Sequence, residues 1–484
     1  MKYFICYRSK IIENAQFHKK SGLFLPHKVD ILKPKQCILP VFSRKPEYTA
    51  KFAHHLRRGV FDMSNSEALK ALAINGGSKA VTTPLPERHH FGAEEKAACN
   101  RIIDEAIAAG AAPGYGGSEE DIFCKEFAEM MGGGYADAVN SGTTSVFVAL
   151  RALNIEPFTE IICGPVTDPG GLMPIVMMNC IPVIADSEPG SFNMSLEGVK
   201  KVYTENTSAI VVPHIAGEPA DIEAICAFAK EKGLKVVEDC AQAHGATVHG
   251  KRVGTFGDAA GYSMMFGKHT CVGGQGGVCF TKDEDTYWRI RQNSDRGKPF
   301  GLPEGSDNCV GSLNFNMDEM HCAIGRVQIK KTADIAKNRR RVVYGIMDAL
   351  KDVPALSISK LPEGAEPSYW FMRILYNQDM MTCDKETFCK AVEAEGMNCN
   401  MRYAATPYTA DWYTKRRVFG NSGYPWAAPE YKGDRDKIYS LADLPNASKA
   451  LDDTIIIYPV ETWTDANIAE CANAFRKAYE AYKK

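Results

Sequence analysis

Short apolar runs alternate with helix-period stretches between residues 160 and 240, and this alternation constrains the fold more than any other feature. The apolar runs are EIICGPV, IPVIADS, SAIVVPH and LKVVEDC, each bounded by glycine, proline or aspartate. Segments of helical periodicity, such as LEGVKKVYTEN and DIEAICAFAKEKG, lie among them. Runs that are apolar on both faces are typical of buried parallel strands. The pattern predicts an α/β fold in which helices cover both faces of a mainly parallel sheet.

The chain divides into three parts of different character. Residues 1–62 carry 13 Lys or Arg against 4 Asp or Glu, so their charge is about +9 and that of the remainder about −11. We expect this basic segment to be disordered or absent from the mature protein, although a transit peptide has the same bias. Residues 63–340 are predicted to form a large domain around the sheet. Residues 341–484, of mixed α+β character, are predicted to form a smaller C-terminal domain.

Charge and cysteine usage exclude several classes of function. A net charge of −2 gives no electrostatic case for nucleic acid or an anionic membrane. No apolar run approaches the roughly 18 residues that a spanning helix needs. The 16 cysteines form no CxxC pair, and HExxH is absent, so no metal site is predicted. We therefore expect a cytoplasmic protein with reduced thiols and a small-molecule partner.

The segment AVNSGTTSVFVALRAL predicts a strand, a turn and an amphipathic helix. Gly142 and Thr143 would begin that helix, directly after Ser141. Free backbone N–H groups and the helix dipole make such a start a natural cradle for a phosphate. A plain Ser/Thr N-cap without a ligand would have the same sequence.

Two further side chains indicate chemistry. Asp239 ends a predicted buried strand, where an unpaired carboxylate is costly, so it needs either a cationic ligand or a salt bridge. Lys268 lies in SMMFGKHTCVGGQGG, among apolar and small residues. Burial would lower the pKa of its amine and make it nucleophilic toward a carbonyl. Otherwise it is a surface lysine beside a glycine turn, with His269 as a polar filler or a supporting group.

A phosphate cradle, a carboxylate for a ring nitrogen and an amine for an aldehyde together suit pyridoxal 5'-phosphate. Several blocks also resemble the DegT/DnrJ/EryC1/StrS family of pyridoxal-phosphate aminotransferases: NSGTTSVFVALRAL, VVPHIAGEPADIEAI, VEDCAQAHGA, GTFGDAAGYSMMFGKH and LNFNMDEMHCAIGRVQI. The resemblance implies the type I aminotransferase fold, with a seven-stranded sheet.

The resemblance also implies a role for each matching residue. Lys268 would be the Schiff-base lysine, Asp239 the partner of the pyridinium nitrogen, and Gln242 the contact to the phenolic oxygen. The implied phosphate contacts are Gly142, Thr143 and Ser263, together with Asn314, which reaches the phosphate in the neighbouring subunit. A homodimer is therefore expected.

One position departs from the family pattern. Where an aromatic ring follows a threonine and stacks on the cofactor, this chain reads CGPVTDPGG, with Asp168 in place of the ring. A carboxylate cannot stack as a ring does. Either a nearby Met or Tyr takes over the contact or this chain binds something unusual, although Asp168 could equally be a turn residue before Pro169.

The function implied by the resemblance is transfer of an amino group from glutamate or glutamine to a nucleotide-linked keto-sugar or a keto-cyclitol. A dehydratase of the same family is the second hypothesis, although such enzymes carry histidine at the lysine position. A non-catalytic cofactor-binding regulator is the third. A Rossmann protein would need GxGxxG after its first strand, which is absent here. Aromatic and cationic groups in residues 401–413 and 424–433 suit a sugar or nucleotide, or else form core.

Overall fold

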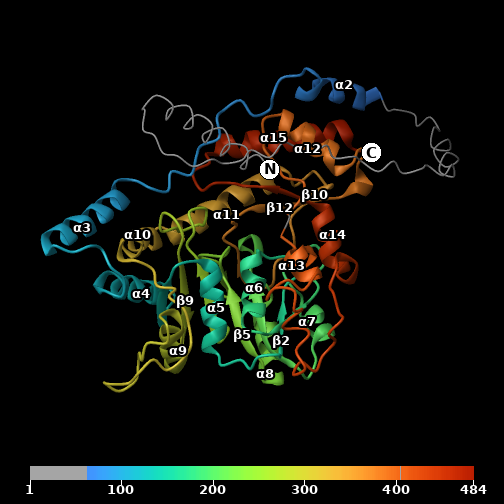
Figure 1. The fold of residues 1–484 in the computed structure, drawn as a ribbon. Helices are drawn as coiled ribbons and strands as arrows, with labels where there is room; N and C mark the ends of the chain where they lie inside the picture. The colour runs from blue at the N-terminus through green and yellow to red at the C-terminus, as the bar shows by residue number, and fades with distance from the viewer. Residues whose placement is uncertain (1–62, 404) are drawn as a thin grey trace, which may run out of the picture. The chain divides into compact units, whose positions relative to one another are not determined.

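The computed structural model describes residues 63–403 and 405–484, so the basic segment 1–62 lies outside the described residues. All the described residues belong to one compact unit. Its centre is a seven-stranded sheet with the order β1-β9-β8-β5-β4-β2-β3 (Figure 1). The strands are β1 (Tyr135–Val139), β2 (Glu160–Cys163), β3 (Ile181–Ile184), β4 (Thr207–Pro213), β5 (Lys235–Asp239), β8 (Ala259–Ser263) and β9 (Gly277–Thr281).

The strand directions confirm the predicted fold class. Strands β3, β2, β4, β5 and β8 run parallel. Strand β9 is reversed and pairs antiparallel with both β8 and β1, so β1 runs in the same direction as the other five. The register aligns Asp239 with Pro213 of β4 on one side and with Gly261 of β8 on the other. The carboxyl ends of three neighbouring strands therefore lie level at one edge of the sheet, where ligands bind in open α/β folds.

Both faces of the sheet are buried, as the apolar runs predict. Ile210 of β4 and Val236 of β5 belong to one core cluster, whereas their neighbours Val211 and Val237 belong to another. Successive strand residues point to opposite faces, so each cluster lies on one side of the sheet. The helices of this region are α3 (Ala93–Ala109), α4 (Ser118–Met130), α5 (Gly142–Ala152), α6 (Pro169–Met177), α7 (Leu196–Val202), α8 (Ile222–Lys232), α9 (Glu284–Ser294) and α10 (Glu319–Ile329).

A smaller antiparallel sheet lies in the C-terminal part of the chain, with the order β10-β12-β13. A separate core cluster joins it to four helices, one of them from the start of the described chain. These elements are β10 (Leu356–Ser357), β12 (Met372–Tyr376), β13 (Thr454–Ile457), α2 (Met63–Ala71), α11 (Thr332–Ala349), α12 (Lys385–Ala394) and α15 (Asp465–Tyr482). None of the described helices is long and apolar enough to cross a membrane. The boundary predicted at residue 340 falls inside α11, and the division into two domains stays a prediction.

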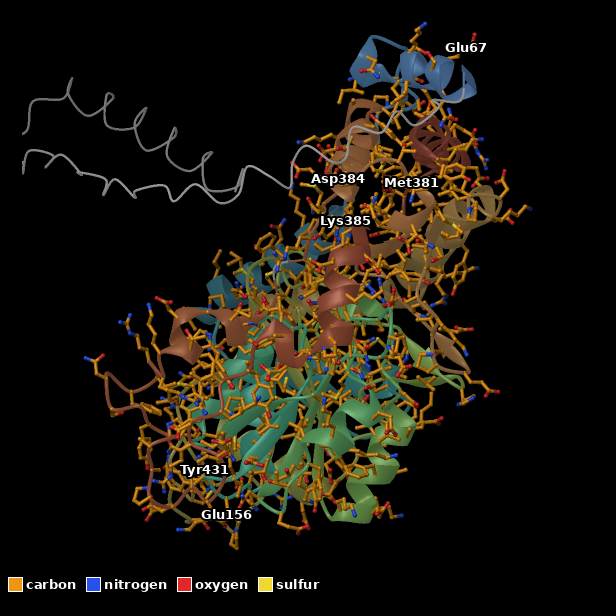
Figure 2. The ribbon with its side chains drawn as sticks, turned by 90° about the vertical axis from the view of Figure 1, so that its right-hand side faces the viewer. Glu67, Glu156, Met381, Asp384, Lys385 and Tyr431 are labelled. Atoms are coloured by element: carbon orange, nitrogen blue, oxygen red, sulfur yellow. The ribbon has the colours of Figure 1, made fainter. Side chains whose placement is uncertain are left out.

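The segment 405–444 packs against the edge of the large sheet. In Figure 2, Tyr431 lies near Glu156 at one end of the molecule, far from Met381. The Tyr431 hydroxyl donates a hydrogen bond of 2.8 Å to Oε1 of Glu160, at the start of β2. This contact anchors the long segment beside the outer strand β3.

Glu238, the residue before the end of β5, anchors the loop that precedes β8. Its side chain is fully buried. Oε2 accepts a hydrogen bond from the N–H of Gly254 at 2.6 Å, and Oε1 accepts from Phe256 at 2.7 Å and Gly257 at 2.8 Å. Nε2 of His214, at the end of β4, lies 3.1 Å from Oε2. The carboxylate therefore ties β4, β5 and the following loop together.

Replacing Glu238 with glutamine should lower the free energy of unfolding by about 3 kcal/mol, because an amide group would face backbone donors in a dry site. Urea denaturation of the purified protein measures the loss. The control is Glu197→Gln on α7, where the carboxylate is 82% exposed and the change should stay below about 0.5 kcal/mol. Equal stability of the two variants would contradict the anchoring role.

Candidate active site

A cavity of about 260 Å³ opens at the carboxyl ends of β4, β5 and β8. Six of the seven residues that are expected to bind the cofactor line it: Gly142, Thr143, Asp239, Gln242, Ser263 and Lys268. Asp168 and Trp370 also line it. Residues that are far apart in the sequence therefore meet at the sheet edge where the predicted strands end.

The start of α5 forms one wall of the cavity. Ser141 caps this helix, since its Oγ accepts a hydrogen bond of 3.2 Å from the N–H of Thr144. Gly142 and Thr143 occupy the first turn, where backbone N–H groups have no partner within the helix. A Cβ atom on Gly142 would lie only 2.4 Å from Cβ of Ser263, so only glycine allows the helix to approach β8 this closely. The N-cap and the free donors thus coexist, and a phosphate fits this wall.

Asp239 presents a carboxylate to the cavity. Its Oδ1 accepts a hydrogen bond of 3.0 Å from the N–H of Ala241. A Cβ atom on Gly171 would lie 2.9 Å from Oδ2, so this glycine leaves room for the second oxygen. Burial raises the pKa of Asp239, whereas the Ala241 hydrogen bond and the charge of Lys268 lower it. Asp239 forms no ion pair with any residue that the structure describes, so the salt-bridge alternative is wrong and Oδ2 remains able to accept a hydrogen bond from a ligand.

Lys268 lies in the loop between β8 and β9, and it lines the cavity. The residue is buried, at 7% exposure, so it is not a surface lysine. Its Nζ lies 4.0 Å from the centre of the Trp370 ring and pairs with no carboxylate among the residues described. Burial lowers the pKa of Lys268 to about 8, although the charges of Asp239 and Asp168 oppose the shift. About a tenth of the amine is therefore neutral, and nucleophilic, at pH 7, which is far more than for an ordinary exposed lysine.

Gln242 connects the cavity to the C-terminal part of the chain. Its Oε1 accepts a hydrogen bond of 2.8 Å from the N–H of Ala216, and its Nε2 donates one of 3.0 Å to the hydroxyl of Tyr403. The amide has a second hydrogen to donate. Of the aromatic segments that the sequence singled out, Tyr403 thus reaches this site, whereas Trp426 and Tyr431 line a separate cavity of about 400 Å³ beside β3.

Asp168 has both of the roles that the sequence left open. It is the N-cap of α6, since Oδ1 accepts a hydrogen bond of 2.9 Å from the N–H of Gly170, and it lines the cavity as well. The aromatic ring at the cavity is Trp370, where a Met or Tyr was expected, with Met265 also on the wall. Trp370 precedes the short strand β12 and belongs to none of the motifs quoted above, so no local signal pointed to it.

Two remaining residues lie away from the cavity. Asn314 is exposed and does not line it; its Oδ1 accepts hydrogen bonds from the N–H of Asn316 at 3.1 Å and from Nδ2 of the same residue at 2.7 Å. Its contact to a neighbouring subunit, and the homodimer, stay predictions. His269 is fully buried, and its Nε2 lies 3.1 Å from the carbonyl oxygen of Ser368. It therefore joins the lysine loop to the segment that carries Trp370.

The residues of the cavity fit pyridoxal phosphate. The first turn of α5 and Ser263 suit the phosphate, the free oxygen of Asp239 suits a protonated ring nitrogen, and the unpaired amine of Lys268 suits an aldehyde. Glycines at positions 142 and 171 preserve this arrangement, because a Cβ atom at the first would clash with Ser263 and one at the second would clash with Oδ2 of Asp239.

Comparisons with known proteins agree with this fit. The GDP-perosamine synthase of Vibrio cholerae is 31% identical over 259 residues, which is 54% of this chain and 70% of that protein. A Micromonospora echinospora protein named as a putative L-glutamine:3-amino-2,3-dideoxy-scyllo-inosose aminotransferase is 29% identical over 58% of this chain and 67% of its own length. The structure of an aminotransferase from Psychrobacter cryohalolentis superposes with a TM-score of 0.69 and 27% identity, over 81% of this chain and 97% of that one.

The match to a family model covers most of the described chain. It extends over residues 94–428, from α3 to the segment beside β3, and so includes every residue that lines the cavity. Members of this family depend on pyridoxal phosphate, which is the cofactor that the cavity fits. The chain belongs to the DegT/DnrJ/EryC1/StrS aminotransferase family and is a pyridoxal-phosphate-dependent aminotransferase.

Proposed function

We propose that this enzyme moves an amino group from glutamate or glutamine to a nucleotide-linked keto-sugar or to a keto-cyclitol.

 The observation that carries the proposal is the buried, unpaired amine of Lys268, which shares one cavity with the free carboxylate oxygen of Asp239 and the first turn of α5. The names of two relatives support the choice of acceptor, since one is a synthase of a nucleotide-linked amino sugar and the other is named for an inosose.

Five groups would hold the cofactor. The N–H groups of Gly142 and Thr143 and the hydroxyl of Ser263 would bind its phosphate, because the helix dipole adds to their hydrogen bonds. Oδ2 of Asp239 would accept a hydrogen bond from the ring nitrogen and keep that nitrogen protonated. The second hydrogen of the Gln242 amide would be donated to the phenolic oxygen.

Bound pyridoxal phosphate supplies an aldehyde and a ring that withdraws electrons. Lys268 would bind that aldehyde and, once displaced by the amino group of the donor, would carry a proton between the donor carbon and the cofactor carbon. An amine whose pKa is about 8 suits this task, because it takes up and releases a proton near neutral pH. Asp239 would stabilise the positive charge on the ring nitrogen throughout.

The acceptor side of the cavity is polar. Asp168 is exposed at the start of α6 and keeps Oδ2 for a ligand, because the N-cap hydrogen bond uses Oδ1. The hydroxyl of Tyr403 lies nearby, bonded to Gln242. A carboxylate and a phenol suit the hydroxyl groups of a sugar or a cyclitol, which supports the proposed class of acceptor.

The enzyme is further proposed to act in the cytoplasm as a homodimer. All fourteen cysteines that the structure describes are free thiols, which supports a reducing compartment. Asn314 would complete the phosphate site of the neighbouring subunit. A dehydratase or a regulatory protein remains the second hypothesis, and the lysine at position 268 favours transamination over both.

The first experiment tests Lys268 itself. The purified wild type should absorb visible light as a bound cofactor does, and glutamate or glutamine should bleach that band. Lys268→Ala should lose the band and reduce turnover by a factor of about 100 to 10,000, because both the attachment point and the proton carrier are gone. Lys200→Ala, on the exposed surface of α7, is the matched control. A wild type that stays colourless with added pyridoxal phosphate refutes the proposal, and a band that no amino acid bleaches favours the second hypothesis.

The pH dependence of cofactor capture tests the charge around Lys268. With the cofactor removed, the rate of recapture should rise with pH through a midpoint near about 8, because only the neutral amine attacks the aldehyde. Asp168→Asn removes a negative charge that favours the ammonium form, so the midpoint should move to lower pH. Asparagine can still cap α6, which keeps the fold intact. An unchanged or higher midpoint in this variant would contradict the role of Asp168.

Mixing two inactive variants tests the predicted subunit contact. Asn314→Ala and Lys268→Ala are each expected to lack activity as pure dimers. If Asn314 serves the neighbouring subunit, a mixed dimer contains one site with both residues intact, and mixing followed by subunit exchange should restore activity. Mixed dimers without activity would place Asn314 at the site of its own chain, and a fully active Asn314→Ala dimer would place it at no site.

A further inference from the structure

Two arginines and one glutamate lie outside the cavity and connect the segments that carry Lys268 and Trp370. Arg88 precedes α3, Arg339 belongs to α11, and Glu461 lies between β13 and α15. Their side chains are largely buried, with exposures of 17% for Arg88, 2% for Arg339 and 11% for Glu461. Three distant parts of the chain thus meet directly behind the lysine loop.

Arg88 holds the main chain of the lysine loop. Its Nη1 donates a hydrogen bond of 2.8 Å to the carbonyl oxygen of Lys268, and its Nη2 donates one of 3.0 Å to that of His269. Its Nε donates to Oε1 of Glu461 at 3.0 Å. The guanidinium makes these contacts from three different nitrogens in one plane, a geometry that the single nitrogen of an ammonium group does not reproduce.

Arg339 does the same for the segment that carries Trp370. Its Nη1 donates hydrogen bonds to the carbonyl oxygens of Tyr369 at 2.9 Å and Trp370 at 3.0 Å, and its Nε donates to Oε2 of Glu461 at 3.0 Å. The indole N–H of Trp370 then donates to the carbonyl oxygen of Gly267 at 3.0 Å. The contacts form a closed circuit that begins and ends at the lysine loop.

The charges make Glu461 the centre of the circuit. Burial and the neighbouring charge of Arg339 lower the pKa of Arg88 to about 10, and the carboxylate of Glu461 opposes this shift. Burial also lowers the pKa of Arg339. Two buried cations therefore share one carboxylate, and without it they would repel each other.

We propose that Arg88, Glu461 and Arg339 are positioning residues that fix the amine of Lys268 against the face of the Trp370 ring. The catalytic consequence rests on the proposed function; the geometric part does not. A lysine side chain has four rotatable bonds, so its amine has a fixed position only if the main chain of Lys268 and the Trp370 ring are both held in place. Arg88 and Arg339 hold them, and the carboxylate of Glu461 holds both arginines.

A spectroscopic test needs neither cofactor nor substrate. The difference in emission between wild type and Trp370→Phe isolates the signal of this indole, which senses a cation 4.0 Å from its ring. In protein freed of cofactor, the emission of this indole should change as the Lys268 amine loses its proton, with a midpoint at about pH 8. Arg88→Lys and Glu461→Gln should remove this step, because the ring and the amine separate. The control is Arg291→Lys, in the pair with Asp137 at 3.1 Å, where the arginine has the same 17% exposure.

A kinetic test measures the consequence for the reaction. Arg88→Lys should slow the donor-driven bleaching of bound cofactor by roughly 10- to 100-fold, since misplacement of a reacting group by about 1 Å has effects of this size. The apparent KM for the donor should change little. In a Trp370→Phe background the same substitution should cost much less, because both changes break one contact, and such coupled effects are not additive. Arg291→Lys should be additive with Trp370→Phe.

The outcomes separate this proposal from the proposed function. If the wild type shows the titrating indole signal and the variants lose it, the circuit positions the amine even when no cofactor chemistry is found. A signal that survives in Arg88→Lys and Glu461→Gln overturns the proposal, as do additive kinetic effects. Thermal melts of the same preparations check folding. If both variants unfold while Arg291→Lys does not, the circuit is only structural and the proposal is also overturned.

Discussion

Two consecutive carboxylates at the end of β5 connect the fold to the site. Successive residues of a strand point to opposite faces, so Glu238 points toward the loop 254–257 and Asp239 points toward the cavity. Backbone N–H groups and His214 satisfy the first carboxylate completely, in a site without exposure to solvent. The second carboxylate keeps one oxygen free. Glu238 therefore makes the end of the strand rigid, and this rigidity fixes the direction in which the carboxylate of Asp239 points.

Much of this arrangement follows from the sequence, because it depends on local patterns. The apolar run LKVVEDC gave a strand that ends at Asp239, and the neighbouring runs gave strands that end beside it. Parallel strands bring their carboxyl ends to one edge, so residues that follow them must meet there. This argument placed Asp239 and Lys268 at one cavity without knowledge of any distance. Asn314 follows no strand of the parallel set, so this argument does not place it, and its contact to a neighbouring subunit stays a prediction.

Trp370 and Arg88 could not be predicted in the same way. Each acts through contacts to the lysine loop that are far away in the sequence, and neither lies in a periodic segment that would point it there. For Asp168, the sequence predicts one of two roles and misses the other. Its position before Pro169 indicates a helix cap, which the structure contains, but the cap leaves one oxygen free at the cavity wall. A local pattern thus identified its backbone role, whereas its electrostatic role depends on the position of Lys268 across the cavity.

The order of these residues along the chain separates cofactor binding from lysine positioning. The groups that fit the phosphate and the ring nitrogen lie between residues 141 and 263, in the part of the chain that forms the large sheet and its helices. The circuit behind Lys268 instead needs Arg88, which precedes that sheet, and Glu461, which follows it by nearly the whole C-terminal part. The cradle therefore depends on the part of the chain that forms the sheet, whereas the direction of the amine depends also on both flanking parts, which contact the lysine loop. Affinity for the cofactor and the rate of proton transfer should consequently respond to different substitutions, because different parts of the sequence set them.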